Sequence, residues 1–218
     1  RFSEVPGSLF EPFVPDDRKL VYPYVGLEIV EDGYVTTQNR DQIDRTEDIQ
    51  MGLAIRGSLG WASESFGSDR DAAIFSASIS RGFGAMDKTA LLFSAWTNGR
   101  VESGNLANAT LSISARFFRR QSEKRTFYAS LSGTAGEALD PDNLVELGGD
   151  TGLRGYPLRY QVGESKMLAT IEQRYFTDWY PFRLARVGGA IFADVGRVWG
   201  PNPLGPDNRD LLANVGIG

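Results

Sequence analysis

The residues with the most chemical potential lie in a glycine-rich stretch, residues 147–161, which contains Arg154. Its four glycines are Gly148, Gly149, Gly152 and Gly155. Because glycine adopts positive φ values that are closed to other residues, we expect a compact, specifically folded loop instead of a helix or strand. An ordered loop of this kind usually holds something in place. The strongest partner candidate is Asp194, an acid inside the otherwise apolar alternating run 191–199.

The composition excludes several kinds of chemistry. The 218 residues include no histidine and no cysteine, so a Ser/His/Asp arrangement, a disulfide and a thiolate metal site are all excluded within this chain. The net charge of −5 argues against a nucleic-acid partner, which requires clustered Lys and Arg. We therefore predict no Ser/His/Asp catalysis, no cofactor, no thiolate metal site and no nucleic-acid partner.

Apolar residues alternate with small or polar residues along most of the chain, which is the period of a β-strand. The alternating runs are residues 20–29, 51–61, 73–79, 89–98, 111–117, 127–132, 169–175, 187–196 and 211–217. No helical period separates them, so we predict an all-β fold, an antiparallel meander of about nine strands. Residues 1–19 are predicted to be an irregular leader or loop, 31–47 a solvent-exposed loop, and 99–108 and 119–125 polar connectors.

Two interpretations of this sheet compete. In a soluble sandwich or barrel the apolar face would be the core, whereas in a membrane barrel it would meet lipid and the Ser/Gly/Arg/Glu face would line the lumen. Long strands, connectors of unequal length and aromatic residues near strand ends favour the membrane barrel. The lipid bilayer is then the first partner. No run of about 18 apolar residues predicts a transmembrane helix.

An odd number of strands is unexpected for such a barrel. Bacterial single-chain barrels close on an even number, because an open edge in lipid leaves backbone groups unsatisfied. The last alternating run also reaches Gly218. We therefore expect further strands outside these 218 residues.

Two motifs resemble those of the BamA/TamA superfamily of outer-membrane barrels, the bacterial surface antigen family. The first is Leu153-Arg154-Gly155-Tyr156, preceded by Leu147-Gly148-Gly149, and the second, about forty residues later, is Phe192-Ala193-Asp194-Val195-Gly196. Glu172, between them, resembles a family position that faces the lumen. Residues 147–218 carry the similarity well, and the earlier strands match only by general pattern.

The resemblance implies a sixteen-stranded barrel in the bacterial outer membrane. Residues 20–218 would be its C-terminal part, and the loop 137–164 would fold into the lumen. The implied function is non-enzymatic: assembly or insertion of outer-membrane proteins, or polypeptide translocation, with client polypeptides and accessory assembly proteins as partners. The alternatives are a membrane anchor or export barrel of an upstream enzyme such as a patatin-like lipase, and a passive surface-exposed barrel.

The residues themselves agree with a loop bound to the inner wall. Phe192, Asp194 and Gly196 share one parity and therefore one face of a strand. We expect Arg154 to pair with Asp194, to stack on Phe192 and to fit close to Gly196, with Gly155 and Tyr156 completing the loop motif. Lysine could not reproduce the planar, two-pronged contact of a guanidinium. The hypothesis is that this pair locks the loop inside.

Other motifs have simpler interpretations. Asp150-Thr151-Gly152 matches the active-site triplet of aspartic proteases, but that chemistry needs a second carboxylate and no second copy exists. Asp140-Pro141-Asp142 suggests weak calcium binding or solvated loop acids. The basic pairs Arg119-Arg120 and Lys124-Arg125 suggest contact with lipid phosphates or a turn at the membrane surface.

Overall fold

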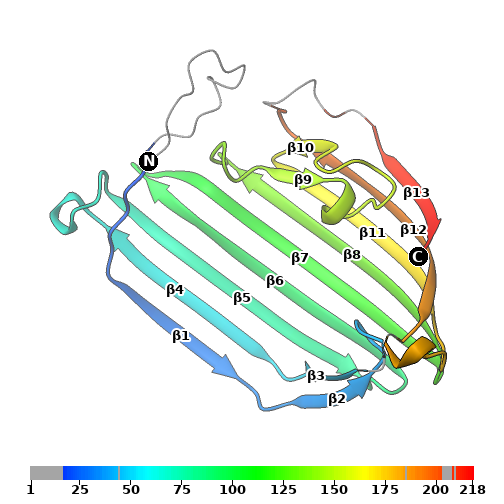
Figure 1. Ribbon diagram of the computed structural model, residues 1–218. Coiled ribbons are helices and arrows are strands. Elements are labelled where there is room, and N and C mark those ends of the chain that lie inside the picture. The colour runs from blue at the N-terminus through cyan, green and yellow to red at the C-terminus, as the bar shows by residue number, and fades with distance from the viewer. Residues whose placement is uncertain (1–16, 44, 185, 203–207, 209) are drawn as a thin grey trace.

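The computed structural model describes residues 17–43, 45–184, 186–202, 208 and 210–218. One antiparallel sheet of nine strands dominates them (Figure 1). In spatial order the strands are β1 (Tyr24–Val30), β4 (Ala54–Ala62), β5 (Ala72–Gly84), β6 (Thr89–Glu102), β7 (Asn105–Ser122), β8 (Arg125–Glu137), β11 (Ser165–Phe176), β12 (Gly188–Trp199) and β13 (Leu212–Ile217). The predicted all-β meander is confirmed. The sheet is not closed, because β1 and β13 are its two edges.

Several strands are longer than the sequence predicted. Residues 99–108 and 119–125, expected as connectors, belong largely to β6, β7 and β8. Only Ser103 and Gly104 separate β6 from β7, and both have positive φ, 50° and 82°. This is the two-residue hairpin whose twist matches that of the flanking strands, so polar residues continue the ladder almost to the turn.

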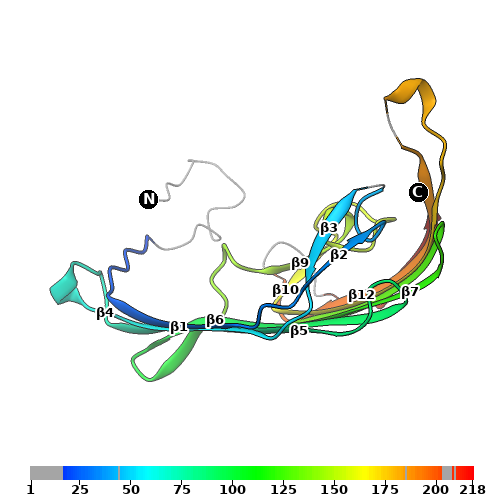
Figure 2. The same ribbon diagram turned by 90° about the horizontal axis from the view of Figure 1, so that it is seen from below.

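The two faces of the sheet differ in composition. Apolar side chains such as Val25 on β1, Ile113 on β7 and Ile191 on β12 occupy one face and are exposed, Val25 by 73% and Ile191 by 58%. Serines, threonines and charged residues occupy the other face. In Figure 2 the sheet curves, and the inserted segments lie on the inner side of the curve, which is the polar face. No described segment covers the apolar face (Figure 2).

Two small hairpins interrupt the meander and lie over the polar face. One is formed by β2 (Tyr34–Gln38) and β3 (Thr46–Gln50), between β1 and β4. The other is formed by β9 (Val145–Leu147) and β10 (Gln161–Gly163), between β8 and β11. The first packs Ile49 and Met51 against a buried cluster that includes Phe118, and the second brings Leu147 to another cluster. The apolar cores therefore form where these insertions meet the sheet.

Residues 31–47, predicted to form a solvent-exposed loop, are mostly exposed where the structure describes them, but residues 34–38 and 46–50 pair as the strands of the β2–β3 hairpin. The Glu47 carboxylate accepts hydrogen bonds from the backbone N–H groups of Arg40 and Asp41, which closes the β2–β3 turn. Arg40 is only 1% exposed and lies 5.8 Å from the Phe118 ring centroid. None of its guanidinium nitrogens has a hydrogen-bond partner. Burial lowers the pKa of Arg40, and the nearby charge of Arg120 lowers it further.

The remaining elements are short. Three 3₁₀ turns are present among the described residues: η2 (Glu64–Phe66), η3 (Gly149–Thr151) and η4 (Pro181–Arg183). In the described part of the chain no helix has the length and apolarity needed to cross a membrane. Of the predicted leader 1–19, residues 1–16 lie outside the described residues, and residues 17–19 have no regular structure.

The unpaired Arg40 yields a stability prediction. Replacing Arg40 with Met keeps much of the side-chain volume and removes a buried cation without a hydrogen bond, so we expect the free energy of unfolding to rise by about 1–2 kcal/mol. Arg116→Met is the matched control. It removes the ion pair to Asp41 on the same hairpin and should lower stability by up to about 1 kcal/mol. Urea unfolding measures both; a destabilised Arg40→Met variant would contradict the prediction.

Candidate functional site

The glycine-rich loop lies on the polar face across β11, β12 and β13. Its base is closed by the β9–β10 pair, in which Leu147 is opposite Gln161. Gln161 accepts a hydrogen bond from the Val198 backbone at 2.9 Å and donates one to the Asp210 carbonyl at 3.0 Å. Leu147 and Leu153 are fully buried against Val198. The loop is therefore an ordered element packed on the sheet, as its composition predicted.

The glycines meet two different requirements. Gly152 has φ of 106°, and a Cβ there would lie 2.2 Å from the Leu168 side chain. Gly155 was expected to adopt positive φ, but it does not. It is needed for space, because a Cβ at Gly155 would lie 2.9 Å from the Asn214 Cβ on β13. The close approach of backbone to sheet places the neighbouring Arg154 over β12.

Arg154 and Asp194 form the predicted two-pronged ion pair. The Arg154 Nε and Nη2 groups donate to the two carboxylate oxygens of Asp194 at 3.1 and 2.9 Å. The backbone N–H of Arg154 also approaches Oδ2, at 3.4 Å. Asp194 is 3% exposed, so its charge is compensated by Arg154 in a largely dehydrated position.

Two further residues of the sheet, Phe192 and Glu172, contact the Arg154 guanidinium. Its carbon lies 3.5 Å from the Phe192 ring centroid, which confirms the predicted stacking. Its third nitrogen, Nη1, lies 2.7 Å from a carboxylate oxygen of Glu172. Glu172 is on the polar face, 8% exposed. Arg154 therefore bridges two acids on neighbouring strands.

Sequence reasoning missed two residues that hold Asp194. Thr170 on β11 and Asn214 on β13 lie directly opposite Asp194 in the strand register. The Thr170 hydroxyl donates to Oδ1 at 2.9 Å, and the Asn214 amide donates to Oδ2 at 3.2 Å. Alternation in the sequence indicates that both residues face the polar side of the sheet. The sequence does not reveal the strand register, which is what makes them neighbours of Asp194.

The other two motif residues, Tyr156 and Gly196, contact different parts of the site. The Tyr156 hydroxyl donates to the Ala213 carbonyl on β13 at 3.2 Å, and its ring packs on Tyr160. Gly196 was expected to leave room for Arg154. A Cβ at this glycine would instead meet the Met167 carbonyl oxygen at 2.8 Å and the Leu147 side chain at 3.1 Å. Gly196 therefore accommodates the base of the loop, whereas Arg154 pairs with Asp194, two residues earlier in the strand.

A series of charges connects the loop to the β2–β3 hairpin. The second oxygen of Glu172 accepts a hydrogen bond from Arg174 Nε at 2.6 Å. Arg174 Nη1 lies 3.7 Å from Asp41 in the hairpin, and Asp41 also pairs with Arg116. The Arg174 guanidinium stacks over the Tyr128 ring at 4.0 Å. Loop and hairpin are thus linked through Glu172 and Arg174.

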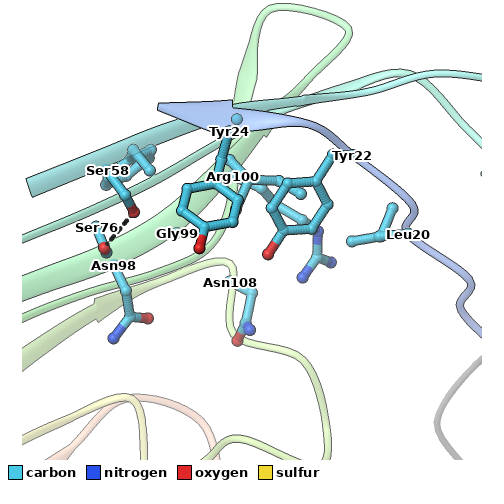
Figure 3. A pocket seen from close by; sticks show the side chains of 12 residues that line it. Leu20, Tyr22, Tyr24, Ser58, Ser76, Asn98, Gly99, Arg100 and Asn108 are labelled. Carbon is cyan, nitrogen blue, oxygen red and sulfur yellow. Dashed lines mark hydrogen bonds between the residues drawn. The ribbon is translucent and has the colours of Figure 1, made fainter. Parts of the chain in front are cut away.

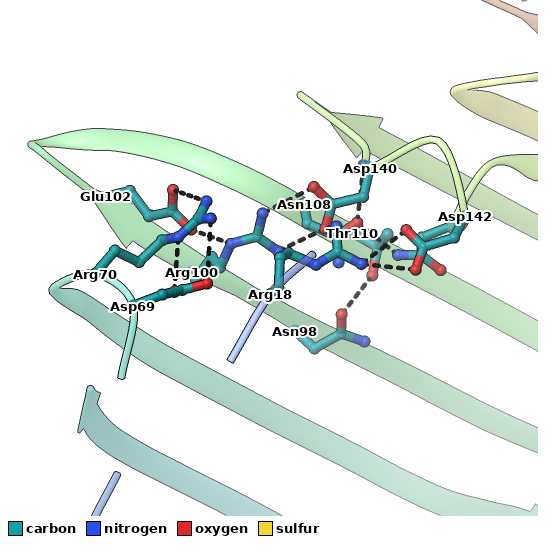
Figure 4. Close-up of polar contacts among 11 residues, drawn as sticks. Arg18, Asp69, Arg70, Asn98, Arg100, Glu102, Asn108, Thr110, Asp140 and Asp142 are labelled. Carbon is teal, nitrogen blue, oxygen red and sulfur yellow. Dashed lines mark hydrogen bonds and ion pairs between the residues drawn. The ribbon is translucent and has the colours of Figure 1, made fainter. Parts of the chain in front are cut away.

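A second cluster holds the first part of the loop (Figure 4). Asp140 accepts two hydrogen bonds from Arg100 on β6, at 2.6 and 2.8 Å, and also pairs with Arg18. Asp142 accepts two more from Arg18. These two acids are therefore neutralised by arginines from distant segments. The loop 137–164 is therefore attached to the polar face near its start, through Asp140 and Asp142, and again through Arg154.

A cavity of about 590 Å³ lies next to this cluster, towards the edge strand β1. Tyr22, Tyr24, Asn98, Arg100 and Asn108 are among the residues that line it. Figure 3 shows the two tyrosine rings side by side, with their hydroxyls on the side of Asn108. The Asn108 side-chain oxygen accepts hydrogen bonds from the Asp140 backbone and the Asn143 amide, so it belongs to the loop attachment as well.

The arrangement is suited to holding a segment in place. Asp150, in the triplet that matches aspartic proteases, is exposed in η3. Across the described residues no group of three acidic side chains is close enough to hold a metal ion. The residues gathered by the loop form stacking, hydrogen-bonding and ionic contacts between the loop and the sheet.

Comparison with known proteins adds no relative. No protein-family model matches the chain, and neither a curated protein nor a solved structure matches it.

The Arg154–Asp194 geometry predicts how the loop responds to substitution. Arg154→Lys keeps the charge but loses the planar fork, so amide hydrogen exchange in residues 147–161 should accelerate about tenfold. Asp194→Asn leaves Arg154 without its main partner and should accelerate exchange about 100-fold. Mass spectrometry of loop peptides measures both rates. Arg56→Lys, which alters an exposed pair with Glu28, is the control and should leave the loop unchanged.

The attachment at Asp140 predicts a response to pH. Burial raises the pKa of Asp140, but hydrogen bonds and charges from Arg100 and Arg18 outweigh it and hold the pKa below the ordinary value of 3.8. Because the pKa of Asp140 is lower in the folded protein than in the unfolded chain, its ionised carboxylate stabilises the attachment at pH values above the unfolded-state pKa. This contribution is lost as the pH falls through the folded-state pKa. Exchange in residues 138–143, corrected for its intrinsic pH dependence, should therefore stay constant from pH 7 to about pH 4 and rise below it. Asp140→Asn should exchange faster at pH 7; equal protection in the variant would contradict this assignment.

Proposed function

We propose that this chain is part of a non-enzymatic β-barrel of the bacterial outer membrane that assists the insertion of other outer-membrane proteins or the translocation of polypeptides. One observation carries the proposal. A nine-stranded sheet exposes a continuous apolar face on one side and binds an ordered loop on its polar face. That combination fits a wall with lipid outside and a lumen inside.

The apolar face supports a lipid environment. Soluble monomers rarely expose contiguous apolar patches of more than a few hundred Å². Here exposed leucine, isoleucine and valine side chains recur on the same face from β1 to β13. Among them, Leu59, Leu131 and Val215 are 57%, 52% and 82% exposed. Lipid would cover such a face in a barrel with alternating strands.

The edges of the sheet support a role in handling other strands. β1 and β13 each have one unpaired side within the described residues. In lipid, unpaired backbone groups cost several kcal/mol each. Further barrel strands or client strands would satisfy them, and strand addition at a sheet edge is a general means of recognising extended polypeptides.

The bound loop supports the same proposal. Arg154 belongs to the first of the two motifs that resemble the BamA/TamA superfamily, and Phe192 and Asp194 belong to the second. Arg154 contacts both of these residues. Similar barrels serve different functions, so the fold alone does not decide between assembly, anchoring of an enzyme and a passive pore. The experiment below is designed to separate these three.

The test uses the purified natural polypeptide in liposomes. We expect it to resist extraction by alkaline carbonate, as an integral membrane protein does, and to accelerate the folding of a urea-unfolded outer-membrane barrel added from outside. Gel mobility of the folded client measures the rate. Arg154→Lys should reduce the acceleration, while Arg56→Lys should not.

Three outcomes would contradict the proposal. Complete extraction by carbonate would argue against a membrane barrel. Integration without any effect on client folding or on polypeptide passage, together with lipase activity of the natural polypeptide, would favour an anchor. Integration with only ion conductance would favour a passive pore.

A further inference from the structure

In each of two basic dipeptides near the short turns, Arg119-Arg120 and Lys124-Arg125, the two side chains lie on opposite faces of the sheet. In the β7 strand, Arg119 shares the parity of Ile113 and so lies on the apolar face, whereas Arg120 shares the parity of Phe118 on the polar face. Arg120 and Lys124 border a cavity on the inner side, which Asn39 also lines. Arg125, the first residue of β8, shares the outward parity of Leu131. One basic residue of each dipeptide therefore faces outward, at the end of the apolar face.

A third arginine has the same placement. Arg81 on β5 shares the outward parity of Ile79, and it stands three positions before the end of its strand, as Arg119 does on β7. The three residues Arg81, Arg119 and Arg125 are exposed. We call them the basic belt. They lie at the end of the sheet next to the turns 85–88 and 123–124, which is opposite the end where the loop 137–164 begins (Figure 1).

The charges of the basic belt are not compensated by the described protein. Arg119 and Arg125 make no ion pair and no side-chain hydrogen bond with any described residue. Arg81 lies only over the Phe83 ring, at 5.7 Å. No aspartate or glutamate occupies an outward position in this half of β5, β6, β7, β8 or β11. Three positive charges thus face outward without a partner.

The surroundings of the belt are those of a membrane boundary. Exposed aromatic residues, Phe83 and Tyr175, stand on the same face near the same strand ends. Tyrosine is enriched at the boundary between the hydrocarbon core and the lipid headgroups. Arginine is also suited to this boundary, because its long side chain places the apolar stem in the hydrocarbon layer and the charge among the headgroups. At the other end of the face, Arg197 donates to the Asn208 carbonyl and Glu137 adds a negative charge. The exposed arginines that make neither an ion pair nor a side-chain hydrogen bond with described residues therefore lie together at one end of this face.

We propose that the basic belt binds the negatively charged headgroups of phospholipids in one leaflet. This inference rests on the proposed membrane location and adds a lipid preference to it. The occupant follows from three observations: the belt continues the apolar face, its charge is positive and unpaired, and the outward positions of the neighbouring strand ends carry no acid, the nearest being Asp87 and Glu123 in the turns. Each arginine near an anionic membrane surface shifts the lipid partition by about fivefold at most, so the preference should be measurable and sensitive to salt.

The experiment measures which lipids the protein retains. The natural polypeptide is reconstituted in phosphatidylcholine membranes that contain spin-labelled phosphatidylglycerol or spin-labelled phosphatidylcholine, and electron paramagnetic resonance gives the motionally restricted fraction of each. We expect a preference for phosphatidylglycerol of about twofold or more, which decreases in 1 M salt. The triple variant Arg81→Gln, Arg119→Gln, Arg125→Gln should restrict as much total lipid without the preference. Arg56→Gln, on the polar face, should behave as wild type.

Each outcome decides something. If neither labelled lipid is restricted, both the proposed membrane location and the proposed lipid binding by the basic belt are contradicted. If lipid is restricted without a preference, or if the triple variant retains the preference, the barrel proposal stands and the belt is overturned. A preference lost equally in Arg56→Gln would also overturn the belt, because it would reflect net charge alone.

Discussion

The ion pair between Arg154 and Asp194 is the contact on which the placement of the loop depends. Asp194 is almost fully buried, and a buried carboxylate without a partner is strongly destabilising. Its two oxygens receive hydrogen bonds from Arg154, Thr170 and Asn214, so three neighbouring structural elements meet at one charge. The stacking of Arg154 on Phe192 fixes the plane of the guanidinium. The loop is therefore held by geometry as well as by charge.

The polar face is organised as a network of compensated charges. Glu172 is shared by Arg154 and Arg174, and Arg174 extends the network towards Asp41 in the β2–β3 hairpin. A change at either inserted segment would alter the electrostatic surroundings of the other through these side chains. The unpaired guanidinium of Arg40 is the exception, since it is buried against an aromatic ring without a hydrogen bond.

The apolar face imposes the opposite constraint. Its side chains alternate with mainly polar ones, so the two faces of the sheet require different kinds of contact. Insertions cover parts of the polar face, and no described segment covers the apolar one. The proposed lipid contact, and the basic belt at its boundary, follow from this asymmetry.

The sequence by itself determined the strands and their two faces, because a period of two depends only on local alternation, and it identified Arg154 and Asp194 through their unusual surroundings. The long-range register was decided only by the tertiary structure. It placed Thr170 and Asn214 beside Asp194 and Leu147 at Gly196, and it turned residues 31–47 into a packed hairpin. Alternation indicates which face a residue occupies, but only strand pairing determines which residue lies opposite it.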